Sequence, residues 1–227
     1  MNNIKSFVLD RFKILSIITV MMSMSIFMLM LRMKLTHSFF YLFLVWNLFL
    51  AVIPYGITTY LNYKQTISKP LLAICFLVWL AFLPNAPYIV TDLWHLRLNE
   101  SNIFWLDILV VTSFASCGLL LFYLSLKDMM AHLNVHLKKF FRDIVPFIII
   151  TLSSFGIYLG RFLRYNSWEI LSNPEYLFSD IVNIILQPFQ HKEAWLFTLT
   201  FTLFLNIGYW VFKGLTLKKP VQSYRRK

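Results

Sequence analysis

Six long apolar runs divide the chain of 227 residues, and only short polar connections lie between them. A membrane-spanning helix needs about 20 apolar residues, with a range of roughly 17 to 25. The runs that reach or approach this length are Ile14–Leu31, Phe39–Tyr60, Pro70–Leu83, Ile103–Leu126, Ile144–Gly160 and Ala194–Phe212. The connections are too short for a separate soluble domain. We therefore predict an all-α polytopic membrane protein, with six transmembrane helices in a single domain over residues 1–227 and a basic cytoplasmic tail at 213–227.

The third run, Pro70–Leu83, is shorter than the others. At 1.5 Å per residue its 14 residues reach about 21 Å, whereas the hydrocarbon core of a membrane is about 30 Å thick. It leads directly into LPNAPYIVTDLWH, in which Pro84 and Pro87 remove backbone donors. Unpaired backbone groups at membrane depth must be covered by protein. The pattern predicts a helix broken at Pro84–Pro87 and buried by its neighbours, and a kinked helix that only packs is the simpler alternative.

Composition supports the membrane assignment. The chain is 59% hydrophobic and 14% charged, against roughly 45–50% and about 25% in soluble domains. The net charge of +11 lies in the connections and the tail, so membrane lipids with anionic headgroups are the expected partners and nucleic acid is not. Cys75 and Cys117 lie inside apolar runs and form neither a disulfide framework nor a metal motif. We expect no cofactor and no metal.

The distribution of charge predicts the orientation. If the N-terminus is inside, fifteen of the 21 Lys and Arg residues fall on the inner side. The positive-inside rule then places both termini in the cytoplasm. The outer side holds seven of the ten acidic residues. It also holds a short amphipathic segment, 175–187, which cannot span the membrane and is expected to lie on its outer surface.

The candidate chemistry lies on this outer side. Asp92 and His95 are three residues apart and share one helix face, so they fit an acid/base pair or two of the three ligands that a catalytic metal needs. Asp107 lies four residues into the fourth run and requires a partner. Arg161 and Arg164 are the obvious candidates. They either neutralise the acids as a structural network or bind an anionic group of a substrate.

Four stretches carry a resemblance to a known family. They are NLFLAVIP at 47–54, WLAFLPNAPYIVTDLWHL at 79–96, WLD at 105–107 and FGIYLGRFLRYNSWEIL at 155–171. Together they resemble the bacterial membrane-protein family called domain of unknown function 1361, from about Trp46 to the last run. Two positions depart from that pattern: Glu169 stands where Asp is frequent, and Leu106 stands where Tyr is common. The resemblance implies a multi-pass protein of a bacterial plasma membrane and supplies no activity.

Three functional hypotheses remain open. The first is a binding or transport-like protein with an outer polar pocket for an anionic or amphipathic envelope molecule. The second is a membrane-embedded enzyme that uses Asp92, His95 and Asp107. The third is an assembly protein in which the polar network is structural. The expected binding residues are Asn85, Tyr88, Asp92, Asp107, Arg161, Arg164, Asn166, Trp168 and Glu169.

Overall fold

A computed structural model describes residues 2–64, 66–98, 103–165 and 174–216. Helices make up the regular structure in these ranges, which contain no strand, so the all-α prediction is confirmed. Six segments are long and apolar enough to cross a membrane: Phe12–Thr36, Phe43–Tyr63, Lys69–Leu96, Phe104–Leu133, Phe141–Arg161 and Lys192–Thr216. The protein is therefore a multi-pass membrane protein with six candidate spans, as predicted.

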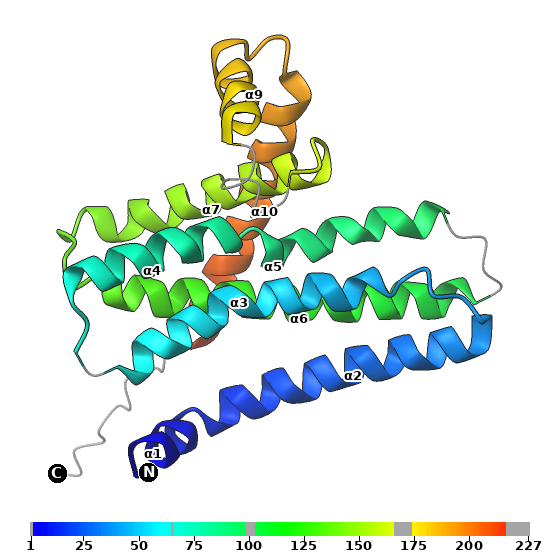
Figure 1. The fold of residues 1–227 in the computed structure, drawn as a ribbon, viewed down its shortest axis with the longest axis horizontal. Coiled ribbons are helices and arrows are strands. Elements are labelled where there is room, and N and C mark those ends of the chain that lie inside the picture. The colour runs from blue at the N-terminus through cyan, green and yellow to red at the C-terminus, as the bar shows by residue number, and fades with distance from the viewer. Residues whose placement is uncertain (1, 65, 99–102, 166–173, 217–227) are drawn as a thin grey trace, which may run out of the picture.

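The helices form one bundle with a short helix outside it (Figure 1). The elements are α1 (Asn2–Asp10), α2 (Phe12–Thr36), α3 (Phe43–Tyr63), α4 (Lys69–Phe82), α5 (Asn85–Tyr88), the 3-10 helix η1 (Ile89–Leu98), α6 (Phe104–Leu133), α7 (Phe141–Arg161), α9 (Pro174–Leu186) and α10 (Lys192–Thr216). In Figure 1, α2 to α7 run side by side, α10 is inclined behind α7, and α9 stands outside the bundle. The beginning of α2 and the end of α10 lie at the same end, where they pair with Asp128 and Asp143.

Helix α6 is the centre of the bundle. It contacts α2, α3, α5 and η1, and Phe114, Phe122 and Leu126 on it are fully buried. Lipid is as apolar as these side chains, so close packing and hydrogen bonds hold such helices together. One of these bonds joins α4 to α6, because Trp79 Nε1 donates to Ser125 Oγ over 2.6 Å.

Several helices run further than the apolar pattern indicated, and the longest C-terminal extensions are those of α2 and α6. The first span was expected to end at Leu31, but α2 continues to Thr36 and carries Arg32 into the interior, where it is 1% exposed. The fourth span was expected to end at Leu126, but α6 continues to Leu133. In both cases polar side chains of the extra turns find partners inside the bundle, so the helix gains contacts beyond the last apolar residue.

The third segment is broken at Pro84, as predicted. α4 ends at Phe82, a turn holds Leu83 and Pro84, and helical turns then resume in α5 and η1. Ala86 N donates to the Leu83 carbonyl (3.2 Å) and Tyr88 N to the Pro84 carbonyl (3.0 Å). The segment is therefore kinked rather than unwound. The apolar run ends at Leu83, and the helical turns beyond it extend the segment to Lys69–Leu96, which is long enough to cross a membrane.

Two glycines allow α6 and α7 to pack closely against the broken segment at Leu83–Pro87. A methyl group at Gly118 of α6 would overlap the carbonyl oxygen of Ala86, and one at Gly156 of α7 would lie 2.7 Å from the ring of Pro84. Only glycine permits so close an approach. As a result Leu83 and Ala86 are fully buried, and the backbone at the break is covered by protein as membrane depth requires.

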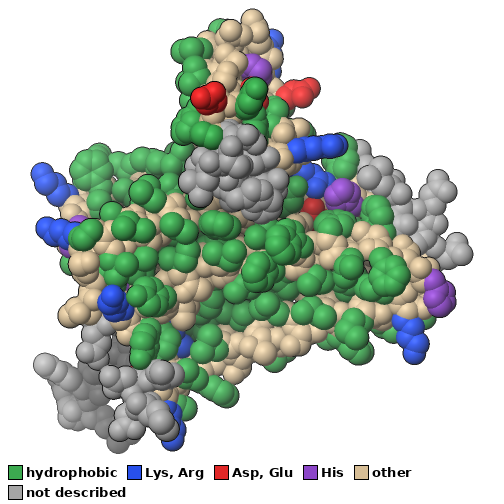
Figure 2. Space-filling model, in the orientation of Figure 1, with side chains coloured by type: hydrophobic (Ala, Val, Ile, Leu, Met, Phe, Trp, Pro, Cys, Tyr) green, Lys and Arg blue, Asp and Glu red, His purple; other side chains and the backbone are tan. Residues whose placement is uncertain are grey.

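Apolar side chains cover the flank of the bundle that Figure 2 shows. On this face Lys and Arg side chains lie at the left end, at the lower right end and at the base of the projection formed by α9, and most of the Asp and Glu side chains lie around α9. Large apolar side chains such as Phe27 of α2 (60% exposed) and Trp210 of α10 (76% exposed) are open to the surroundings. This arrangement is the one expected of helices in contact with lipid.

Candidate functional site

Asp92 is the centre of a polar cluster at the end of the bundle away from the termini. Its Oδ1 accepts a hydrogen bond from Arg161 Nη1 (3.0 Å), and its Oδ2 accepts one from Asn47 Nδ2 (2.8 Å). The carboxylate comes from η1, the amide from α3 and the guanidinium from the last turn of α7. With an exposure of 1%, Asp92 is a buried charge whose two oxygens are both engaged. The cluster thus ties three spans together at one carboxylate.

His95 joins this cluster through Arg161. Residues three apart lie directly above one another in a 3-10 helix, so His95 Nε2 lies 3.8 Å from Asp92 Oδ1 and 3.2 Å from Arg161 Nη2. An arginine only donates, so Nε2 accepts and the proton lies on Nδ1. Nδ1 is buried and has no hydrogen-bond partner in the described ranges. The ring stands edge-on to Phe43, with centroids 5.0 Å apart, as in a weak contact between N–H and an aromatic face.

Asp107 lies in a different pair from the one expected. Arg32 Nε donates to Asp107 Oδ1 over 2.9 Å, and the exposures of the two side chains are 1% and 0%. Arg32 Nη1 also donates to the Ser38 carbonyl (3.0 Å), and its guanidinium lies 4.7 Å from the centre of the Tyr41 ring. The prediction that Arg161 or Arg164 neutralises Asp107 was therefore wrong. Arg161 pairs with Asp92 instead.

Arg164 follows the end of α7 and is exposed. Its φ of 63° is left-handed, as is common just after a helix end, and it turns the chain so that Tyr165 N donates to the Leu159 carbonyl (3.1 Å). Tyr165 then donates its hydroxyl to Asp180 of α9 (2.8 Å). Arg164 takes no part in the Asp92 cluster. Asn166, Trp168 and Glu169, also expected at the site, lie outside the described residues.

A pocket of about 170 Å³ lies beside the Asp92 cluster, between α3, the broken segment, α7 and α9. Its apolar lining includes Trp46, Leu50, Leu159 and Leu177, and its polar lining is Asn47, Asn85, Tyr88 and Tyr165. The described part of the lining contains no charged side chain. Arg161 is not a lining residue, but its guanidinium lies 5.8 Å from the ring centre of the lining residue Tyr88.

Two polar groups of this pocket are available to a ligand. Asn47 donates to Asp92 through Nδ2, and no hydrogen bond joins its Oδ1 to another residue that the structure describes. No such bond joins the Tyr88 hydroxyl to a described residue either. An amide oxygen and a phenol, set among apolar side chains, are typical of a site that recognises a small polar group on a larger apolar molecule.

The expected catalytic set is only partly assembled. Asp92 and His95 are neighbours, whereas Asp107 bonds to Arg32. No group of three or more His, Cys, Asp or Glu side chains that could hold a metal gathers in the described parts of the chain. Both oxygens of Asp92 already accept hydrogen bonds, so the arrangement fits charge compensation better than proton transfer.

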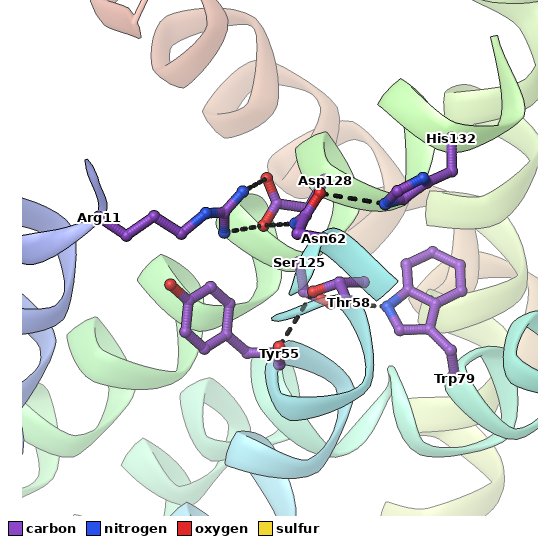
Figure 3. Close-up of polar contacts among 8 residues, drawn as sticks. All are labelled: Arg11, Tyr55, Thr58, Asn62, Trp79, Ser125, Asp128 and His132. Atoms are coloured by element: carbon purple, nitrogen blue, oxygen red, sulfur yellow. Dashed lines mark hydrogen bonds and ion pairs between the residues drawn. The ribbon is translucent and has the colours of Figure 1, made fainter. Parts of the chain in front are cut away.

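A second polar cluster at the opposite end was not predicted (Figure 3). Arg11 donates to both oxygens of Asp128, over 2.7 and 3.3 Å, and Asn62 Nδ2 donates to Asp128 Oδ2 (2.9 Å). His132 Nε2 lies 3.0 Å from Asn62 Oδ1. Burial lowers the pKa of Arg11, but its hydrogen bond to Asp128 and the charge of that carboxylate outweigh this and raise the pKa overall. The cluster fixes the start of α2 against α3 and α6.

Some polar residues of the two clusters were not predicted as site residues, and the sequence contains a signal for only some of them. Asn47 stands inside the second apolar run, where a polar side chain is the signal of a hydrogen bond between helices, and its bond to Asp92 is one. Arg32 stands one residue beyond an apolar run. The signal that could have found it is Asp107, an acid inside an apolar run that requires a cation nearby. The pairing of Arg11 with Asp128 joins residues 117 apart, and no local pattern indicates it.

The comparison with protein families identifies one matching family. The family described as protein of unknown function (DUF1361) matches residues 46–207, which include the broken segment, the Asp92 cluster and the pocket. Neither the curated proteins nor the solved structures include a match to the chain. Because the family match covers well over half of the sequence, the chain belongs to the DUF1361 family of proteins of unknown function.

Proposed function

We propose that the protein binds an amphipathic molecule of the cell envelope in the pocket between α3, the broken third segment and α7. The observation that carries this proposal is the combination of an apolar lining with the Asn47 side-chain oxygen and the Tyr88 hydroxyl, neither of which is hydrogen-bonded to a described residue. A ligand headgroup would hydrogen-bond to these two groups while its apolar part lies against Trp46 and Leu50. Arg164 is exposed just beyond the pocket residue Tyr165 and would supply positive charge if the headgroup is anionic.

The ion pairs of Asp92 and Asp107 favour a binding function over a catalytic one. Asp92 and Asp107 each have an arginine at about 3 Å, so neither is a free base facing the pocket. A purely structural role would account for the pair of Arg32 and Asp107, which is sealed in protein. It would not account for a pocket in which the Asn47 oxygen and the Tyr88 hydroxyl make no hydrogen bond to a described residue.

A pocket-filling substitution tests this proposal. We expect Leu50→Trp to occupy the pocket and to reduce the amount of co-purified ligand at least tenfold. Tyr88→Phe removes one hydroxyl and should weaken retention about fivefold, since a hydrogen bond contributes roughly 1 kcal/mol. Native mass spectrometry and lipid extraction of the purified protein provide the measurement.

Leu77→Trp is the matched control, because Leu77 is 65% exposed on α4 and is not a lining residue. It should retain the same molecules as the wild type. If the wild type, Leu50→Trp and Leu77→Trp all co-purify with the same molecules in the same amounts, the pocket is not a binding site and the proposal is wrong.

We also propose that the end bearing both termini faces the cytoplasm of a bacterium, with the pocket at the outer face. The excess of Lys and Arg at that end supports this orientation. In a background without Cys75 and Cys117, we expect Arg164→Cys to react with a membrane-impermeant maleimide on intact cells. Lys138→Cys, which is equally exposed, should react only after permeabilisation. The reverse pattern of labelling would overturn the orientation.

A further inference from the structure

A second pocket lies at the end of the bundle that carries the termini, between the last turns of α6, the first turns of α7 and the end of α10. Its volume is about 230 Å³. Three of its lining side chains are cationic, Lys127, Arg142 and Lys213, one from each helix. The pocket beside Asp92 has no charged side chain in its described lining. The pocket at this end therefore has a cationic lining, whereas the described lining of the other is uncharged.

These cations are available to an external anion. Within the described ranges, neither Lys127 nor Arg142 forms an ion pair. Lys213 lies 3.7 Å from Asp143, but both of these side chains are largely exposed, and such a pair contributes little. Three converging positive charges with one exposed carboxylate nearby leave a net positive site. Arg142 also lies in the first turn of α7, where the helix dipole favours an anion.

The remaining lining points to a lipid rather than to a soluble anion. Met130, Pro146 and Phe212 form the apolar part of the pocket, and they belong to the end turns of segments long enough to span the membrane. A phosphate held by the cations would lie at headgroup level, and its acyl chains would continue along the apolar flank of α7 and α10. Free phosphate would gain nothing from these apolar side chains.

The same pocket contains a polar atom that lacks a partner. Asn134 Oδ1 is buried and makes no hydrogen bond to any described residue, and Asn134 lines this pocket. A buried acceptor without a donor is costly. A hydroxyl on the headgroup alcohol of a lipid such as phosphatidylglycerol would supply that donor.

From these observations we propose that the pocket between α6, α7 and α10 binds the phosphate headgroup of an anionic phospholipid. Lys127, Arg142 and Lys213 hold the phosphate, and Asn134 accepts a hydrogen bond from the headgroup alcohol. The lipid fills the gap between α10 and the rest of the bundle at this end. It therefore acts as a structural ligand, independent of the pocket near Asp92.

The test uses the full-length protein in nanodiscs that contain equal amounts of phosphatidylglycerol and phosphatidylcholine. Native mass spectrometry after release from the nanodisc should show phosphatidylglycerol retained in preference to phosphatidylcholine. In the double variant Lys127→Gln/Arg142→Gln we expect this retention to fall roughly thirtyfold, from about fivefold per cation removed. Addition of 10 mM inorganic phosphate, about ten times a weak millimolar affinity, should not displace the lipid.

The matched control is Lys138→Gln/Lys139→Gln. Both of these lysines are exposed, lie at the same end and are not lining residues, so the two double variants lose the same charge. The control should retain phosphatidylglycerol as the wild type does. An equal loss in both double variants means that the attraction is general, and an unchanged retention in both means that the pocket is empty; either result overturns the proposal. Displacement by inorganic phosphate would assign the site to a soluble anion and overturn the lipid assignment.

Discussion

Arg32→Met is expected to destabilise the protein by about 3–5 kcal/mol, because it leaves the carboxylate of Asp107 buried without its cation. The two side chains are 1% and 0% exposed and lie 2.9 Å apart. Methionine keeps most of the length and the apolar stem of the arginine, so the loss of the charge dominates the effect. For a chain of this size we expect the midpoint of thermal unfolding in detergent to fall by roughly 10 °C or more, with a matching loss of protein from the membrane fraction.

A double substitution tests whether the unpaired charge of Asp107 causes this loss of stability. Arg32→Met/Asp107→Leu removes both charges and should recover most of the lost stability, since replacing a whole buried ion pair by apolar side chains is frequently neutral. Lys34→Met, on the same helix but exposed, should change the unfolding temperature little. If the double variant is as unstable as Arg32→Met alone, the unpaired charge is not the cause of the instability.

Arg161→Met is expected to cost about 3 kcal/mol, at the lower end of the range for a broken buried pair. Asp92 is 1% exposed but would keep its hydrogen bond to Asn47, and Arg161 itself is 15% exposed, so part of its charge is already screened. The loss should loosen η1 from α7 as well. Limited proteolysis near residue 98, read together with thermal unfolding, measures both effects.

Arg164→Met provides the control for this prediction. The same substitution three residues later removes an exposed arginine that takes no part in the Asp92 cluster, and it should leave stability unchanged. Adding Asp92→Asn to Arg161→Met removes the buried charge and should restore much of the loss. Equal destabilisation by Arg161→Met and Arg164→Met would contradict the assignment of the ion pair to Arg161.

The sequence was sufficient for the spans and for the break, because both follow from local properties. Long apolar runs are costly outside a membrane, and two prolines within four residues cannot continue a regular helix. The amphipathic helix expected at 175–187 is present as Pro174–Leu186. The structural relation of Asp92 to His95 was also accessible, since a spacing of three places two residues on one face in either kind of helix.

The partners of the buried acids could not be read in the same way. The apolar run ends at Leu31, so the sequence pattern places Arg32 in the loop that follows. In the structure α2 continues to Thr36, because Arg32 finds a buried partner in Asp107. Of the two arginines on one face of the fifth span, only Arg161 reaches Asp92, because α7 ends at Arg161 and the chain turns at Arg164. Pairings of this kind depend on how distant helices approach one another, which the spacing of residues along one helix does not determine.

The pairing of each buried acid with its own arginine also determines how the protein responds to a membrane potential. A single charge that crosses the whole membrane changes its energy by about 2.3 kcal/mol per 100 mV. Each of these pairs sums to no net charge, and its charges are separated by 2.9 or 3.0 Å, about a tenth of a hydrocarbon core of about 30 Å. The field therefore changes the energy of each pair by at most about 0.2 kcal/mol per 100 mV. As long as each pair stays together, the membrane potential therefore has little effect on these two pairs, unlike on the gating arginines of a voltage sensor, which carry charge across the field.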